Sequence, residues 1–346
     1  MRDHLAAAVT RAWDPRSPAE RVVGLLLVPA SMVYGAAVVV RNRLYDAGWL
    51  GQTRVSARVL SVGNLTVGGT GKTPAALWLA QALVRRGRRV GIVARGYRKR
   101  RPGVVVVGTD GVPLVSAEDG GDEAVMLARR FAGPVVTGER RVEAATEACA
   151  RFGLDTLVLD DGFQHRALAR DADLVLLADD HAARRLLPAG SRREPLAALA
   201  RARAVLSVGD HEPSWLPGTA RSSCFRARLV ATALVDGAWQ ETALAVLDGA
   251  RVVAVAGVAR PDRFAATLEG CGAHVVDRLT FPDHHDYSAG DVAAIVAAAR
   301  GGELVTTEKD LVKLAGRPGL EHLHALRVAL EVDDGDRLVD LLDGTT

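Results

Sequence analysis

Aromatic side chains and cysteines are scarce in this chain. Phe, Trp and Tyr make up 4% of the 346 residues while 49% of the residues are hydrophobic, so Leu, Val and Ala must fill the cores. That hydrophobic content argues against wholesale disorder. The three cysteines, Cys149, Cys224 and Cys271, lie far apart, match no metal-ligand spacing and are odd in number. They favour a reducing cytoplasmic environment without a disulfide framework.

Neither sign of charge dominates the chain. The 44 Lys and Arg residues against 41 Asp and Glu residues give a formal net charge of +3 at pH 7. No basic stripe interleaved with aromatic residues is present, nor is an internal repeat or a low-complexity segment. We therefore expect no nucleic-acid partner. Because one domain usually takes roughly 100–200 residues, the length predicts two domains.

One long apolar run stands near the N-terminus. Val22 to Val40 holds 19 residues without a charge, bounded by Arg21 and Arg41. At about 1.5 Å per residue, a helix of this length falls a little short of a roughly 30 Å hydrocarbon core. A long mixed segment precedes the run and no small-residue cleavage site follows it, which argues against a signal peptide. A tilted membrane span, a helix lying in the membrane interface and a buried helix of a soluble protein stay open, and Pro29 weakens the first.

A glycine-rich segment between an apolar strand and a predicted helix is typical of a phosphate-binding loop. Thr66-Val67-Gly68-Gly69-Thr70-Gly71-Lys72-Thr73 fits the pattern G-x-x-x-x-G-K-[ST] except at its first position, where Thr66 replaces glycine. Loop N–H groups and the helix dipole favour phosphate there. We expect Lys72 to reach the outer phosphates of a nucleotide and the Thr73 hydroxyl to bind Mg²⁺.

Acidic residues occur at two further places. Asp160 and Asp161 end a predicted strand, where an acidic residue holds Mg²⁺ in phosphate-loop proteins, and His165 could contact a phosphate or orient a loop. Asp122 and Glu123 open a predicted helix. A carboxylate there could accept the proton of an attacking alcohol and its neighbour could help hold the metal. The alternative is that the two residues cap the helix and balance its dipole.

Other charged groups have two interpretations each. Arginines that could bind anions or simply lie on the surface are Arg95, Arg140, Arg141, Arg192 and Arg193. The segment Phe281-Pro282-Asp283-His284-His285 suggests either a metal site or a histidine that pairs with a carboxylate. The segment Thr306-Thr307-Glu308-Lys309-Asp310 resembles base-reading loops of nucleotide-binding proteins, or caps the helix after it.

Strand-like and helix-like segments alternate after the phosphate loop, which predicts a parallel sheet with helices on both faces. The predicted strands are residues 89–94, 103–107, 134–136, 155–159 and 173–177, and residues 139–152 form a helix. Residues 224–235 and 239–246 predict a hairpin with Asp236-Gly237 as its turn. A second series follows, with strands at 251–256 and 303–306 and a helix at 261–270.

Several of these motifs together resemble the tetraacyldisaccharide 4′-kinases of lipid A biosynthesis. The Asp-Asp-Gly-Phe-Gln-His string at residues 160–165 is far more specific than a phosphate loop alone. The other motifs, in family order, are Val62 to Pro74, Arg95-Gly96-Tyr97, Gly121-Asp122-Glu123, Leu187-Pro188-Ala189-Gly190, Arg193-Glu194-Pro195, Phe281-Pro282-Asp283-His284 and Thr307-Glu308-Lys309-Asp310.

The resemblance implies a kinase that uses ATP and Mg²⁺ to phosphorylate the 4′-hydroxyl of tetraacyldisaccharide 1-phosphate, which gives lipid IVA. It implies a lipid-linked disaccharide as substrate and no obligatory protein partner. The protein would lie on the cytoplasmic face of the bacterial inner membrane, as a peripheral or singly anchored enzyme. The implied parts are a membrane-associated tail and helix (1–45), a P-loop kinase lobe (46–221), a two-stranded linker (222–248) and a smaller α/β lobe (249–346).

The resemblance also implies residue roles. Asp122 is the general base, tuned by His284, and Lys72 acts on the transferred phosphoryl group. Residues 66–73 bind the nucleotide, and Thr73, Glu123 and Asp161 surround the metal. The residues implied to contact phosphates or sugar are Arg95, Arg141, His165 and Arg193. Whether Arg140 or Arg141, and whether Arg192 or Arg193, makes the contact stays open.

Two other classes compete with the kinase. A membrane-associated ATPase switch has a lysine where this chain has Val67. A GTP-binding module would read guanine through Lys309 and Asp310, but its usual pattern is not matched cleanly at Glu308.

Overall fold

The computed structural model describes residues 9–13, 15, 17–178, 185–209, 216 and 223–344. The chain divides into two compact units, each of which is described by itself. The first comprises Met1–Lys72, Asp155–Arg228 and Val332–Thr346, and the second comprises Thr73–Leu154 and Leu229–Glu331. Both are mixed α/β with mostly parallel strands, which confirms the predicted fold class at this level. The division at residues 45, 221 and 248 stays a prediction, and residues 1–8 of the predicted tail lie outside the described residues.

The first unit is built on a buried parallel sheet in the order β8-β7-β1-β6. Its strands are nearly continuous apolar runs, as expected for a parallel sheet covered on both faces. The elements are β1 (Arg58–Asn64), β6 (Thr156–Asp160), β7 (Ala172–Ala178), the 3-10 helix Leu196–Arg201, β8 (Ala204–Val208) and α12 (Gly335–Asp343). Since Val62 of β1 lies opposite Asp160 of β6, the phosphate loop and the Asp160-Asp161 segment leave the sheet at the same edge.

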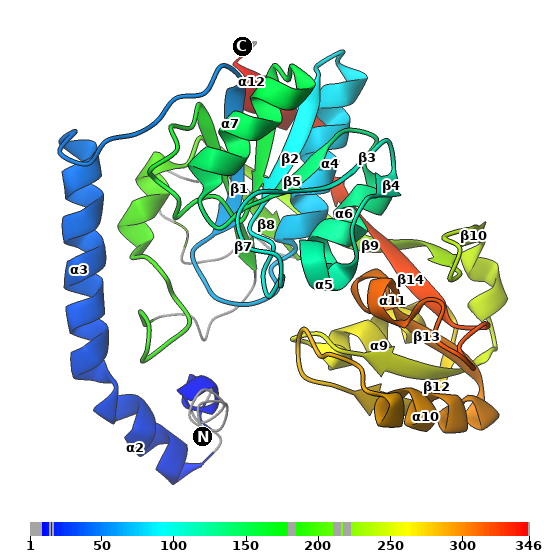
Figure 1. Ribbon diagram of the computed structural model, residues 1–346. Helices are drawn as coiled ribbons and strands as arrows, with labels where there is room; N and C mark the ends of the chain where they lie inside the picture. Colours follow the sequence, from blue (N-terminus) through cyan, green and yellow to red (C-terminus); the bar gives the residue numbers. More distant parts are fainter. Residues whose placement is uncertain are drawn as a thin grey trace. The chain divides into compact units, whose positions relative to one another are not determined.

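Two helices near the N-terminus replace the single helix that the apolar run could have formed. They are α2 (Pro18–Leu26) and α3 (Val28–Asp46), which meet at a bend of 41° (Figure 1). Pro29 explains the break, because it lacks an N–H group for the helix ladder and its ring crowds the preceding turn. Among the described residues no single helix is long and apolar enough to cross a membrane, and only this bent pair passes by length and composition together.

Helix α3 buries mainly small and polar residues and exposes several of its apolar ones. Its buried residues are Ser31, Gly35, Val38 and Asn42, spaced along one face. The Ser31 hydroxyl donates to the Leu186 carbonyl at 2.8 Å. Apolar residues on the two helices are instead largely exposed: Val22, Leu25, Leu26, Met32, Val33 and Val40.

The second unit contains two groups of strands. In the first, β2 and β5 are parallel, while β3 pairs antiparallel with β5 and with β4. Helix α6 packs against β3, β4 and β5, and α7 packs against β2 and β5. The elements are α4 (Lys72–Arg85, whose first residue belongs to the other unit), β2 (Val90–Ala94), β3 (Val105–Thr109), β4 (Val112–Pro113), α5 (Ala117–Gly120), α6 (Asp122–Arg130), β5 (Val135–Thr137) and α7 (Arg141–Phe152).

The second group of strands is parallel, in the order β12-β11-β13-β14. Alternate residues of β11 serve two cores: Val253 and Val255 pack with residues of α10 and α11, and Val252 and Ala254 pack with α9. The elements are β11 (Arg251–Ala256), α9 (Pro261–Gly270), β12 (His274–Thr280), α10 (Ala289–Ala298), the 3-10 helix Ala299–Gly301, β13 (Glu303–Thr307), α11 (Glu308–Leu314) and β14 (His324–Val332). Helices thus cover both faces of this sheet.

The predicted hairpin is present, but its second strand is short. Strand β9 (Cys224–Val235) pairs antiparallel with β10 (Glu241–Thr242), and a 3-10 helix, Leu244–Leu247, follows. The prediction of a strand at 239–246 is therefore wrong over most of its length. The Asp236 carboxylate accepts hydrogen bonds from the N–H groups of Ala238 and Gln240, so it holds residues 236–240 in a turn and delays the strand.

Candidate active site

The phosphate loop of the first unit runs from the end of β1 to the start of α4. The Asn64 amide donates to the Thr70 hydroxyl at 2.8 Å and so ties the two ends of the loop together. Gly71, just before α4, has a φ of +83°, a conformation in which a side chain would be strained. The loop also rests on a neighbouring segment, because the Val67 N–H donates to the Ser191 carbonyl at 2.8 Å. The backbone is therefore shaped before any nucleotide binds.

Lys72, Asp161 and Arg193 form a charge cluster beside the loop. The Lys72 ammonium donates to the Gly68 carbonyl at 3.3 Å and lies 3.8 Å from an Asp161 carboxylate oxygen. The Arg193 guanidinium contacts both Asp161 oxygens, at 3.0 and 2.9 Å. Of the Arg192 and Arg193 pair, it is thus Arg193 that reaches the acidic end of β6. Two cations around one carboxylate leave a net positive charge, which suits a polyphosphate.

A buried glutamate supports this cluster from behind. Glu194 has no solvent exposure and accepts hydrogen bonds from Asn42 of α3 at 2.6 Å and from Arg201 at 3.0 Å. Gln164 donates to Glu194 at 3.2 Å and to the Asn64 carbonyl at 3.0 Å, so it bridges Glu194 to the start of the phosphate loop. His165 is half-buried next to Gln164, and its backbone carbonyl accepts from Arg170.

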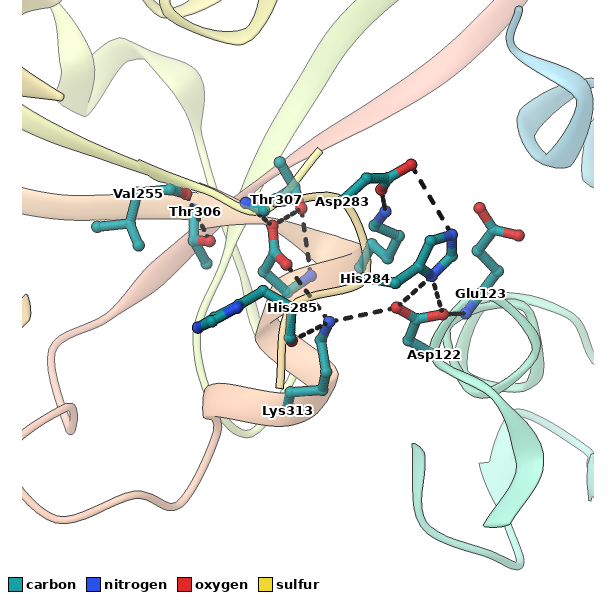
Figure 2. A network of polar contacts seen from close by, with 12 residues as sticks. Asp122, Glu123, Val255, Asp283, His284, His285, Thr306, Thr307 and Lys313 are labelled. Carbon is teal, nitrogen blue, oxygen red and sulfur yellow. Dashed lines mark hydrogen bonds and ion pairs between the residues drawn. The ribbon is translucent and has the colours of Figure 1, made fainter. Parts of the chain in front are cut away.

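The second unit places Asp122 directly against His284. Gly121 precedes Asp122 with a φ of +91°, and a Cβ there would lie 3.1 Å from the Gly96 Cα, so only glycine fits at this helix start. Asp122 is the first residue of α6, and its carboxylate accepts from the N–H of Glu123 at 2.9 Å. The His284 Nδ1 atom lies 3.0 Å from each Asp122 oxygen (Figure 2). Because a carboxylate only accepts, Nδ1 carries the hydrogen and donates it.

Cations surround the Asp122 carboxylate. The Lys313 ammonium of α11 donates to an Asp122 oxygen at 3.3 Å (Figure 2). Burial alone would raise the pKa of Asp122, but the hydrogen bond and charge of His284, followed by the charges of Lys313 and Lys309, outweigh it and lower the pKa to about 2. Asp122 is therefore an anion at neutral pH although its side chain is only 8% exposed.

The Arg95-Gly96-Tyr97 motif ends beside the same histidine. The Tyr97 and His284 rings have centroids 4.8 Å apart, and the Arg98 guanidinium donates to the His284 carbonyl at 3.1 Å. Arg95 itself is exposed just after β2. His284 has a φ of 60° and Arg98 a φ of 58°, values that are uncommon outside glycine and often mark functional sites.

Of the arginines 140 and 141, the second is the buried one. Arg141 is 2% exposed and donates to the Gly138 carbonyl at 2.7 Å, whereas the Arg140 side chain is 81% exposed and pairs with Glu143. Both residues lie in the second unit, as do Thr73 and Glu123. The roles of these residues, and of Arg95 and His165, stay predictions.

Lys313 is not among the predicted site residues, and its neighbours Lys309 and Asp310 make internal contacts. Lys309 pairs with Asp283, and buried Asp310 accepts from the Gly257 N–H at 2.9 Å and from the Thr307 hydroxyl at 2.8 Å. These internal contacts occupy the side chains that a guanine-reading loop would need. The only available signal for Lys313 was its position three residues after Asp310, one helical turn along α11.

Comparison with known proteins gives the family. The family model described as tetraacyldisaccharide-1-P 4′-kinase matches residues 23–346. The chain belongs to this family. It is 46% identical to the tetraacyldisaccharide 4′-kinase of Anaeromyxobacter dehalogenans strain 2CP-C over 87% of this chain and 84% of that one. It is 41% identical to the enzyme of the same name from Anaeromyxobacter sp. strain Fw109-5, over 97% and 96% of the two chains.

A solved structure agrees with this assignment. The crystal structure of LpxK from Aquifex aeolicus in complex with ATP matches with a TM-score of 0.79 and 32% identity, over 93% of this chain and 99% of that one. The prediction of a 4′-kinase of lipid A biosynthesis is therefore confirmed. The two competing classes, the membrane-associated ATPase switch and the GTP-binding module, are not supported.

Proposed function

We propose that this chain transfers the γ-phosphoryl group of ATP to the 4′-hydroxyl of tetraacyldisaccharide 1-phosphate, with Asp122 and His284 acting on the hydroxyl. Membership of the 4′-kinase family supports the reaction. The observation that supports the residue roles is the contact of His284 with both oxygens of a buried, ionised Asp122 at the start of α6.

The phosphate loop binds the triphosphate. Its N–H groups and the positive end of the α4 dipole attract the phosphate oxygens. Lys72 and Arg193 neutralise the negative charge of the transferred phosphoryl group. In the free protein these two cations rest on Asp161. A polyphosphate competes for them, so binding of ATP loosens the pairing with Asp161 and frees that carboxylate.

The Asp122 carboxylate orients the 4′-hydroxyl and receives its proton late in the transfer. A carboxylate with a pKa of about 2 is a weak base. It suffices because the phosphoryl transition state is loose and the alcohol becomes strongly acidic only as its bond to phosphorus forms. His284 holds the carboxylate in place through Nδ1.

Mg²⁺ is held by Thr73, Glu123 and Asp161 in this proposal. The donors are all oxygens, which suits Mg²⁺. The described residues contain no group of three or more His, Cys, Asp or Glu side chains able to bind a metal. Mg²⁺ commonly uses one or two carboxylates together with waters and substrate phosphates. When bound, the ion would supply positive charge against the negative charge that develops on the phosphate oxygens.

Helices α2 and α3 attach the enzyme to the cytoplasmic face of the inner membrane. A substrate with four acyl chains stays in the bilayer, so the enzyme must work at its surface. The exposed apolar residues of these helices, including Leu26 at 74% and Met32 at 70% exposure, would enter the membrane interface. The polar and small face of α3 packs on residues 186–194 instead, which ties this attachment to the phosphate loop.

The direct test is incubation of the full chain with ATP, Mg²⁺ and the tetraacyldisaccharide 1-phosphate in detergent micelles or vesicles, followed by mass analysis. One added phosphate on the distal sugar supports the proposal. Hydrolysis of ATP without a phosphorylated lipid would refute it. Omission of Mg²⁺, and substitution of GTP for ATP, serve as controls.

A further inference from the structure

Lys313 is held by two hydrogen bonds and one longer ion pair, and Asp122 accepts one of the hydrogen bonds. Its ammonium donates to the His285 carbonyl at 2.9 Å and to an Asp122 oxygen at 3.3 Å, and it lies 3.7 Å from an Asp310 oxygen. Two of the three N–H donors of the ammonium thus make hydrogen bonds, and the Asp310 carboxylate adds an ion-pair contact. The Lys313 side chain is only 12% exposed, so its ammonium group is enclosed by these contacts and is not a mobile surface charge.

The helix that carries Lys313 lies antiparallel to the helix that carries Asp122. Lys313, near the end of α11, meets Asp122 at the start of α6, while Glu308, at the start of α11, meets Arg130 at the end of α6 at 2.8 Å. Glu308 is only 4% exposed and also binds Arg327 at 2.7 Å. Two ion pairs at opposite ends therefore set the register between the two helices.

The rest of α11 is anchored to its own sheet. The Thr307 side chain caps the helix, accepting from the Asp310 N–H at 3.2 Å, and Asp310 binds the Gly257 N–H after β11. Lys313 thus stands on a helix fixed to β13 and β11 and reaches across to α6 (Figure 2). Its position does not depend on Asp122, so it can restrain Asp122.

The contacts divide the Asp122 carboxylate among its partners. One oxygen receives the Glu123 N–H and His284, and the other receives His284 and Lys313. His284 Nδ1 carries one hydrogen and shares it between the two oxygens, so three donors occupy a carboxylate with about four lone-pair sites and leave room for a further donor. Because His284 contacts both oxygens, it does not by itself distinguish one from the other. Lys313 contacts one oxygen alone and so fixes which oxygen faces α11.

From these contacts we propose that Lys313 is a positioning residue of the phosphoryl transfer, one that holds the Asp122 carboxylate in the orientation that accepts the 4′-hydroxyl. The proposal rests on the function proposed above. Lys313 acts through Asp122 and does not contact ATP. Its loss should therefore lower kcat and leave the affinity for ATP unchanged, since small errors in the placement of a reacting group slow the transfer steeply.

A double-mutant cycle tests this. The variants are Lys313→Met, Asp122→Asn and the double variant. The matched control is Arg317→Met, because Arg317 is an exposed cation just after α11 whose side chain reaches the backbone carbonyl of Lys313 and not the Asp122 carboxylate. At saturating ATP and lipid, Lys313→Met should lower kcat about 10-fold or more. In the Asp122→Asn background the same change should have no further effect. Arg317→Met should behave as the unchanged enzyme, and the Kd for ATP should stay the same in all variants.

The outcomes separate this inference from the proposed function. Additive losses in the double variant, or an unchanged kcat in Lys313→Met, would overturn the role of Lys313 while leaving that of Asp122 intact. An unchanged kcat in Asp122→Asn would overturn the proposed function itself. Lys313→Arg keeps the positive charge and should recover part of the rate that Lys313→Met loses. If Lys313→Met fails to fold, Lys313→Arg is compared with Lys313→Gln, which is polar but uncharged. Equal kcat values for Lys313→Arg and Lys313→Gln would then overturn the inference.

Discussion

His284 Nδ1 lies 3.0 Å from each of the two carboxylate oxygens of Asp122, although the two residues are 162 positions apart in the chain. The contact joins the start of α6 to the loop after β12. It places the Asp122 carboxylate, the proposed proton acceptor, against the His284 ring, which would keep that carboxylate in position.

Removal of the His284 ring should slow transfer less than removal of the Asp122 charge. In His284→Ala the carboxylate keeps its contacts with the Glu123 N–H and with Lys313, so it stays partly oriented. We expect kcat to fall about 10-fold, compared with about 100-fold or more for loss of a general base. Steady-state kinetics on the lipid disaccharide measure this. A loss in His284→Ala equal to or larger than that in Asp122→Asn would mean that the ring itself handles the proton.

The lowered pKa of Asp122 predicts a loss of stability in acid. Its pKa is about 2 in the folded protein against an ordinary value of 3.8, so the ionised group stabilises the fold above pH 4, and this contribution disappears as pH falls toward 2. Between pH 5 and pH 2.5 the unfolding free energy should fall by about 1.5 kcal/mol more in the unchanged chain than in Asp122→Asn. Urea unfolding of both chains at the two pH values measures the difference. Equal losses would show that the folded carboxylate titrates normally.

Removal of the Glu194 carboxylate should destabilise the first unit strongly. Glu194→Ala leaves the partly buried Arg201 cation without its carboxylate partner and the Asn42 amide without its acceptor. Breaking a buried pair from one side destabilises a protein by about 3–5 kcal/mol. Chemical denaturation followed by circular dichroism gives this value. Glu147→Ala, at an exposed glutamate of α7, is the control and should change stability by less than about 0.5 kcal/mol.

Polar substitutions on α2 and α3 should weaken membrane attachment without touching the nucleotide site. The triple variant Leu26→Ser, Met32→Ser, Val33→Ser removes three side chains that are each at least 70% exposed, so the fold should persist. Sedimentation with vesicles of anionic and zwitterionic lipid should show binding reduced about 10-fold or more, given about 1.5–3 kcal/mol per buried large apolar side chain.

The matched control for this variant is Val112→Ser with Leu114→Ser, at residues that are 55% and 56% exposed in the second unit. It should bind vesicles like the unchanged chain. Affinity for ATP should be equal in all three proteins. Full vesicle binding by the triple variant would show that these helices are not the attachment surface.

The sequence allowed local elements to be predicted more readily than contacts. Strands β9 and β11 and helix α9 occur at the predicted residues, because the apolar residues of the strands and the proline at the start of α9 mark them clearly. The second hairpin strand was predicted too long because the hydrogen bonds of the Asp236 side chain were not foreseen. The break between α2 and α3 follows from Pro29, which had already weakened the prediction of a single span.

At the candidate site, too, contacts between distant residues were harder to predict than the residues themselves. Motifs and family resemblance pointed to Asp122 and His284 together, and the structure places them in contact. The contacts of Lys313 with Asp122 and of Glu308 with Arg130 were not predicted, because the partners are more than 170 residues apart. A single sequence carries no signal for such a pairing, since the contact depends on how α11 packs on α6.

The central claim is that Asp122 acts on the acceptor hydroxyl and not on the nucleotide. The measurement that tests it most directly is single-turnover transfer of phosphate from ATP to tetraacyldisaccharide 1-phosphate by Asp122→Asn, alongside the Kd for ATP of the same variant. The account predicts a transfer rate about 100-fold or more below that of the unchanged chain, with an unchanged Kd. A normal transfer rate, or a loss explained by weaker ATP binding, would contradict it.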